Sequence, residues 1–122
     1  MEIKAAVTAL GALAQETRLS IYRLLVETGP DGLPAGQIGE ALKVPGATLS
    51  FHLKELARAG LLSARQERQF IYYAVDFTHM AQLMTYLTKN CCRGMPQACL
   101  SEVETALGSC CPPNLKTKRK RS

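Results

Sequence analysis

Apolar residues recur every three or four positions in five stretches of the chain, which is the spacing of one face of an α-helix. Between the fourth and fifth stretches, two short segments instead alternate apolar and polar residues, which is typical of strands. The pattern therefore predicts a mainly α-helical chain with a small β-hairpin. The expected helices span residues 2–13, 15–27, 34–42, 47–59 and 76–90, and the expected strands span 61–66 and 69–75, joined by a two-residue loop at Glu67-Arg68.

The fourth expected helix carries the most informative pattern. Leu49, Leu53 and Leu56 form one narrow apolar stripe along it. The opposite sector combines hydroxyl, aromatic and charged side chains, which suits a helix that enters a DNA major groove better than a merely solvated face. Hydroxyl groups meet base edges or phosphates there, and an apolar ring can contact a thymine methyl group. This sector and its flanks comprise Thr48, Ser50, Phe51, Lys54, Glu55 and Arg58.

The segments around this helix complete a recognisable order. Residues 43–46 are expected to form the turn between two helices, and Gly60 is expected to end the second of them. The hairpin follows at once. Helix, turn, helix and hairpin are the outline of a winged helix-turn-helix.

Three sequence motifs follow one another in register between residues 9 and 90. The fourth helix carries TxSxHLxxLxxAGL from Thr48, an earlier helix carries ALAxxTRLxI from Ala12, and the hairpin carries RxE from Arg65 and IYY from Ile71. Together they resemble the ArsR/SmtB family of metal-responsive repressors. The resemblance implies a winged helix-turn-helix with five helices and a two-stranded wing, in which the first and last helices form the dimer.

The candidate DNA-contacting residues lie on the fourth helix and on the hairpin. His52 lies on the flank of the helix, and both a DNA contact, which the resemblance implies, and a packing role stay open. Arg68 stands where related wings usually carry glycine, because φ is often positive at that position. It shares the wing with Arg65, and phosphate contact and ordinary solvation are both open for these two cations. The full candidate set is Thr48, Ser50, Phe51, His52, Lys54, Arg65 and Arg68.

The last expected helix has a continuous apolar stripe, and Asp76 can cap its first turn. Because the earlier helices already supply a core, a further apolar helix indicates a homodimer seam shared with the first helix. The alternative is that it only covers the core of its own chain. The stripe consists of Phe77, Met80, Leu83, Met84 and Leu87.

Three cysteines, Cys91, Cys92 and Cys99, follow directly after this helix. The segment between them contains Gly94 and Pro96 and can reverse, so that three thiolates converge and suit a soft, thiophilic ion. Trivalent arsenic and antimony prefer three sulfurs in a pyramid, whereas zinc prefers four ligands in a tetrahedron. The expected effector is therefore arsenite or antimonite, with zinc less favoured.

The family resemblance bears on the same site. The cysteine arrangement of this chain is similar to that of family members that sense arsenite through a C-terminal Cys-Cys pair and a third cysteine. Other members bind zinc through carboxylate and imidazole groups on the last helix, and only Asp76 and His79 weakly resemble that site here. We therefore expect no zinc site of this kind, and we expect His79 to be solvated. Cys110 and Cys111 are either further ligands or incidental thiols.

The net charge of +5 comes entirely from the end of the chain. Five of the fifteen cations lie at positions 116–121, and the rest of the chain is balanced between ten cations and ten anions. We expect a DNA-binding and dimerisation domain at 1–90, an effector-binding extension at 91–108 and a disordered basic tail at 109–122. The tail either adds phosphate affinity or is simply solvated.

At 122 residues the chain is expected to hold one domain. No apolar run reaches membrane-spanning length and the N-terminus has no signal-peptide pattern, so we expect a cytoplasmic protein without a membrane partner. Thiols in that compartment stay reduced, so the five cysteines are expected to be ligands or redox sensors and not structural disulfides.

The leading hypothesis is a homodimeric repressor that holds double-stranded operator DNA and releases it when arsenite or antimonite binds Cys91, Cys92 and Cys99. A second hypothesis keeps the repressor but replaces the ligand by thiol oxidation or by zinc. A third is a metal-trafficking module whose helices contact protein. An enzyme is the least favoured, because the chain has no phosphate-binding glycine loop, paired catalytic acids or Cys-x5-Arg loop.

Overall fold

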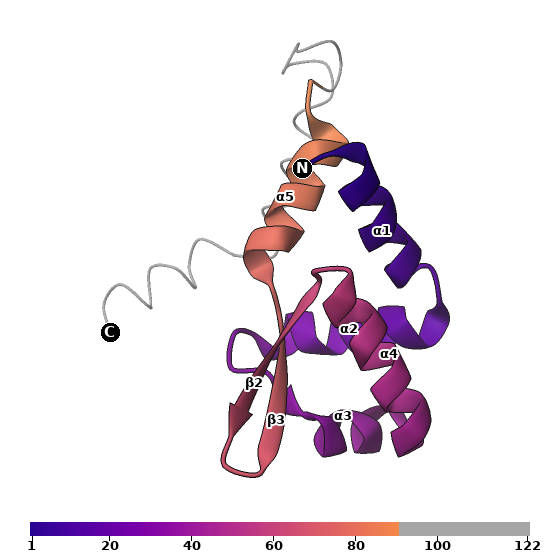
Figure 1. Cartoon of the computed structure of the whole chain (residues 1–122), viewed down its shortest axis with the longest axis vertical. Coiled ribbons are helices and arrows are strands. Elements are labelled where there is room, and N and C mark those ends of the chain that lie inside the picture. Colours follow the sequence, from indigo (N-terminus) through magenta and orange to yellow (C-terminus); the bar gives the residue numbers. More distant parts are fainter. Residues whose placement is uncertain (91–122) are drawn as a thin grey trace, which may run out of the picture. The chain divides into compact units, whose positions relative to one another are not determined.

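The computed structural model of the protein describes residues 1–90, in which all five expected helices and both expected strands form. In Figure 1 the hairpin extends beside α3, whereas α1 and α5 lie at the other end of the unit. No described helix is long and apolar enough to cross a membrane. The elements are α1 (Ile3–Leu13), α2 (Glu16–Thr28), β1 (Leu33–Pro34), α3 (Ala35–Leu42), α4 (Gly46–Arg58), β2 (Leu62–Glu67), β3 (Phe70–Val75) and α5 (Phe77–Thr88).

The sheet has one strand more than the expected two-stranded wing. Its order is β1-β3-β2, and β1 pairs antiparallel to β3 with Leu33 opposite Tyr73 and Pro34 opposite Tyr72. A strand of two residues is too short to show alternation in the sequence. Pro34, which we expected inside the third helix, lies in this edge strand and precedes α3 as its N-cap. Proline is tolerated at an edge because it has no N–H to donate to a ladder.

The loop at the tip of the wing is shifted by one residue from the expected position. Glu67 pairs with Phe70, so the two loop residues are Arg68 and Gln69. Arg68 has a φ of 59°, in the left-handed region that glycine favours. A side chain in this region costs roughly 1 kcal/mol, so the wing carries its extra cation on strained backbone.

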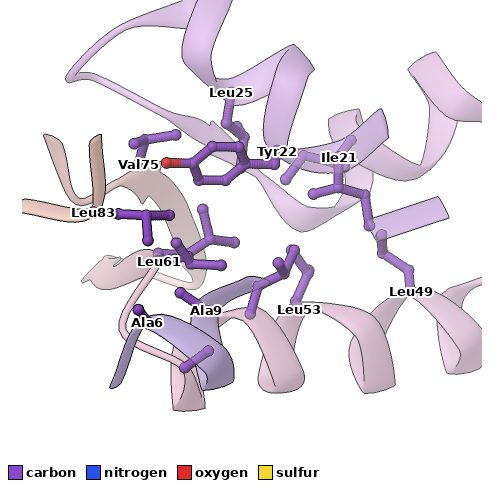
Figure 2. Close-up of a cluster of buried hydrophobic side chains, with 14 residues drawn as sticks. Ala6, Ala9, Ile21, Tyr22, Leu25, Leu49, Leu53, Leu61, Val75 and Leu83 are labelled. Carbon is purple, nitrogen blue, oxygen red and sulfur yellow. The ribbon is translucent and has the colours of Figure 1, made fainter. Parts of the chain in front are cut away.

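The hydrophobic core lies where α4 meets α2 and the base of the hairpin (Figure 2). The predicted stripe of α4 is confirmed, because Leu49, Leu53 and Leu56 are all buried. The last helix contributes Leu83, which lies near Leu61 in Figure 2. This packing fixes the orientation of α4. The other large buried side chains are Ile21, Tyr22, Leu25, Ile38, Leu62 and Val75.

Tyr22 brings a phenol group into this core. Burial raises the pKa of its phenol to about 12, and the negative charge of Asp76 acts in the same direction. The phenol is therefore uncharged at any physiological pH. Tyr22 therefore packs in the core as a neutral side chain.

Replacing Gly32 with alanine should lower the free energy of unfolding by more than about 1 kcal/mol. Gly32 has a φ of 72°, and a Cβ there would collide with the backbone carbonyl of Tyr73, the residue that pairs with β1. Gly36→Ala is the matched control, because a Cβ at Gly36 meets nothing within 4 Å. Urea denaturation followed by circular dichroism measures both variants. Equal midpoints for the two variants would contradict the close approach of backbone at Gly32.

Candidate nucleic-acid interface

A tight turn joins α3 to α4. Lys43 adopts the left-handed conformation with a φ of 57°, and the Val44 N–H donates to the Gly39 carbonyl at 3.0 Å. A Cβ on Gly39 would lie 3.2 Å from the Val44 carbonyl oxygen and 3.3 Å from the Leu49 side chain, so glycine lets the two helices approach closely. Pro45 then precedes α4 as its N-cap. The predicted helix-turn-helix is confirmed.

The exposed side of α4 carries most of the predicted DNA-contacting residues. Thr48, Ser50, Phe51 and Lys54 are exposed, opposite the buried leucine stripe. Phe51 lies near the middle of this side, with 57% of its surface accessible. Towards the C-terminal end of α4, Arg58 pairs with Glu55 at 2.8 Å, which partly neutralises the end of the helix. The side therefore offers hydroxyls, one cation and an aromatic ring to a groove.

His52 faces inward and has only 8% of its surface exposed. Its Nδ1 lies 3.3 Å from an Nη of Arg18, and its ring meets the ring of Phe51 edge-on at 5.5 Å. The burial favours the packing role that the sequence left open over a direct DNA contact. Arg18 also donates from Nε to the Ala12 carbonyl at 2.7 Å. Sequence reasoning gave Arg18 no role, although it lies in the ALAxxTRLxI motif.

The two cations of the wing differ in how firmly they are held. Arg65 donates from Nε to Glu67 at 2.7 Å and from an Nη to the Asp31 carbonyl at 3.2 Å, and its guanidinium lies 5.0 Å from the centre of the Tyr72 ring. Arg68 lies at the tip and is exposed. Arg65 is thus already engaged within the chain, while Arg68 is an exposed cation on the loop.

Two open hollows flank α3. The larger, of about 560 Å³, lies along the turn and is lined by Lys43, Pro45, Gly46 and Ser50 among others. The smaller, of about 310 Å³, separates α3 from the wing and is lined by residues that include Gln37, Phe70 and Tyr72. Glu40 lines both. In neither hollow do several charged groups converge on one point. Both are therefore open surface depressions and not closed ligand pockets.

A second surface is formed by α1 and α5. On α1 the small residues Ala6 and Ala9 are buried, while Ile3 and Val7 expose 64% and 61% of their surface. On α5, Leu83 is buried and Leu87 is 56% exposed. These two helices therefore present large apolar side chains outward, which is typical of an interface between chains. We call this the α1–α5 surface; it comprises Ile3, Val7, Leu10, Met84 and Leu87.

His79 is not the solvated residue that the sequence suggested. Its Nε2 is buried and has no hydrogen-bond partner among the described residues, and its ring packs against Gly60. Asp76 caps the first turn of α5 by accepting from the His79 N–H at 3.0 Å, as predicted. The described residues contain no group of three or more His, Cys, Asp or Glu side chains able to hold a metal. The predicted ligands Cys91, Cys92 and Cys99, and also Cys110 and Cys111, lie outside the described residues.

Comparison with known proteins gives both sequence and fold similarity. A helix-turn-helix domain family matches residues 13–63. The transcriptional activator HlyU of Vibrio cholerae is 32% identical over 88 residues, which is 72% of this chain and 79% of HlyU. A solved structure of HlyU superposes with a TM-score of 0.56 at 33% identity, covering 71% of this chain and 97% of that one. HlyU has also been solved in a reduced form.

Two further solved structures are similar to about two thirds or more of the chain. A crystal structure of a possible transcriptional regulator for arsenical resistance has a TM-score of 0.57 and 28% identity, covering 65% of this chain and 79% of that chain. The homodimeric winged helix-turn-helix DNA-binding domain of Mb0332 from Mycobacterium bovis, a possible ArsR-family regulator, has a TM-score of 0.57 and 25% identity, covering 72% and 82%. The helix-turn-helix and wing of this chain are thus similar to those of DNA-binding regulators.

Proposed function

The chain belongs to the ArsR/SmtB family of winged helix-turn-helix transcriptional regulators, and from this premise we propose that it is an arsenic-responsive repressor. In this proposal a homodimer holds operator DNA and releases it when trivalent arsenic or antimony binds Cys91, Cys92 and Cys99. Like its relatives, the chain is a DNA-binding transcriptional regulator and not an enzyme.

The exposed side of α4 is the observation that carries the operator-binding part of the proposal. A helix held by Leu49, Leu53 and Leu56 presents its opposite side as one rigid surface, which a major groove can accept. Thr48, Ser50 and Lys54 are placed to contact base edges or phosphates. Arg68 on the wing adds a phosphate contact beside the groove. His52 acts behind this surface, through its contacts with Arg18 and Phe51.

The α1–α5 surface supports the homodimer. Its large apolar side chains are exposed in a single chain, and a second copy would bury them. The homodimeric state of the similar Mb0332 domain supports the same arrangement. A two-fold dimer presents two copies of α4, so the operator should be a pseudo-palindrome with half-sites about one helical turn apart.

Two observations support the proposed effector: the position of the cysteines in the sequence and the similarity to one solved structure. Cys91 follows closely after α5, whose stripe contributes to the α1–α5 surface, so a bond to Cys91 acts on the dimer. The similarity to a possible regulator for arsenical resistance supports trivalent arsenic as the ion. Release requires that arsenic bind the DNA-incompetent geometry more tightly than the DNA-bound one.

An arsenite titration of the reduced, full-length protein on an operator duplex tests this function. The duplex is selected from a random library by the protein itself, and fluorescence anisotropy measures affinity. Arsenite should weaken binding by about 5- to 150-fold, the usual range of coupling between two sites. Antimonite should act similarly and zinc weakly. Unchanged affinity at arsenite concentrations well above that of the protein thiols would exclude the effector.

Thiol oxidation is the second candidate, and the reduced form in which HlyU has been solved favours testing it. Adjacent Cys91 and Cys92, or Cys92 with Cys99, can form a disulfide. Peroxide would then release DNA while arsenite would not. The same duplex and the same assay distinguish the two candidates.

Removal of residues 113–122 should lower non-specific DNA affinity without altering operator preference or the arsenic response. Five cations leave with this segment, and each lost phosphate contact reduces the salt slope of binding by roughly 0.9. Affinities for a random duplex at several salt concentrations measure the slope. An unaltered slope would show that the tail does not contact phosphate.

A further inference from the structure

We propose that Phe51 reads the C5 methyl group of a thymine, and that Arg18 and His52 fix the orientation of its ring. The inference rests on the proposed function, because it needs α4 to lie in a major groove. It deepens that function by naming the residue that determines part of the operator sequence. The groups that carry it form a continuous chain of contacts from the end of α1 to the exposed side of α4.

The position of Phe51 singles it out on α4. At 100° per residue, Phe51 points away from the stripe of Leu49, Leu53 and Leu56, and 57% of its surface is exposed. Lys54 lies about one turn further along the same side. In the major groove the thymine methyl is the base feature that an apolar side chain distinguishes. A phenyl ring beside a phosphate-seeking cation is therefore suited to recognise thymine.

The Phe51 ring meets the ring of His52, which is in turn in polar contact with Arg18. The edge-on contact with His52 joins the two rings at 5.5 Å between centroids, with their planes at 61°. Arg18 lies 3.3 Å from the Nδ1 of His52 and donates to the Ala12 carbonyl at 2.7 Å. Because a guanidinium can only donate, a hydrogen bond here requires Nδ1 to accept, with the ring proton on Nε2. His52 is thereby fixed in ring orientation as well as position, and Phe51 with it.

Uracil is the sharp probe, because it pairs like thymine and lacks only the methyl group. Losing the burial of one methyl group weakens binding by about fourfold for each half-site and about fifteenfold for a symmetric dimer site. The operator duplex selected by the full-length protein is remade with uracil in place of thymine at each position of one half-site, then at both. Fluorescence anisotropy gives the thymine-to-uracil affinity ratio.

Two variants separate methyl recognition from general DNA binding. Phe51→Ala should reduce the ratio at the recognised position to about 1. Lys54→Ala, the matched control on the same side of α4, should weaken binding to both duplexes and keep the ratio of the wild type. A thymine preference that survives in Phe51→Ala, or wild-type binding that ignores the methyl group at every position, overturns the proposal.

His52→Gln tests the positioning role. A glutamine oxygen can still accept from Arg18, but the ring that meets Phe51 is lost. The thymine-to-uracil ratio should fall toward 1 while the salt dependence of binding stays that of the wild type. An unchanged ratio overturns the positioning role. If selection yields no preferred duplex at all, the operator-binding function fails, and this is distinct from a selected duplex whose methyl groups do not matter.

Discussion

Replacing Val7 with aspartate should convert the protein to a folded monomer and lower its operator affinity by roughly 10²–10⁴-fold. Val7 lies on α1 with 61% of its surface exposed, so the charge costs little in a single chain. In a dimer the same charge would be buried among Ile3, Leu10 and the partner's apolar residues without a counter-ion. A monomer occupies one half-site and loses the second contact that raises the avidity of a dimer.

Sedimentation velocity at micromolar concentration measures the association state, and circular dichroism checks the fold. Leu19→Asp is the matched control, because Leu19 is an exposed leucine on α2, outside the α1–α5 surface. It should remain a dimer with unaltered operator affinity. A dimeric Val7→Asp, or a monomeric wild type that still binds one operator specifically, would count against the interface.

The core of the fold could be predicted because its signals are local in sequence. The leucine stripe of α4 shows in its spacing alone, and burial of all three leucines confirms it. Alternation predicted β2 and β3 within one residue of their limits. The sequence does not predict β1, because a strand of two residues is too short to show an alternating pattern. The predicted wing loop lies one residue too early, because alternation does not determine where a turn begins.

The arrangement of α1 is the opposite of what size alone would suggest. An Ala-rich helix reads as weakly amphipathic, yet Ala6 and Ala9 face the core while Ile3 and Val7 face outward. Small side chains let α1 approach the core closely, and Figure 2 shows Ala6 and Ala9 within the cluster of buried side chains. The sequence indicated a dimer seam from the stripe of α5. Only the structure shows which large residues of α1 are available to it.

The contact between Arg18 and His52 was beyond sequence reasoning for a different reason. The two residues are 34 positions apart, and neither lies in a pattern that requires the other. The family resemblance implies a DNA contact for His52, with packing as the alternative. The sequence predicts a solvated His79, whereas its ring packs against Gly60 after the end of α4. Long-range packing of polar side chains has no period, so sequence alone can offer only alternatives for both histidines.

Replacing Cys91 or Cys92 with serine should abolish the release of operator DNA by arsenite while leaving DNA affinity intact. Serine keeps the size and polarity of cysteine but has little affinity for a thiophilic ion. The cysteines follow α5 in sequence and belong neither to α4 nor to the wing, so DNA contact through α4 should not change. Anisotropy with the selected duplex, with and without arsenite, measures both quantities. Normal release in both variants, together with loss of the peroxide response, would establish the redox candidate instead.

Cys99→Ser discriminates between ligand sets. In a site of three sulfurs, losing Cys99 should raise the arsenite concentration for half-release at least about tenfold, which corresponds to about 1.4 kcal/mol. A methylated trivalent arsenical has one bond fewer to give, so the adjacent pair Cys91 and Cys92 should still capture it, and release by this probe should persist in Cys99→Ser. Loss of both responses would mean that Cys99 is indispensable for coupling as well as for binding. A normal arsenite response in Cys99→Ser would remove Cys99 from the site, and Cys110→Ser and Cys111→Ser in that background would then show which of these thiols supplies the third sulfur.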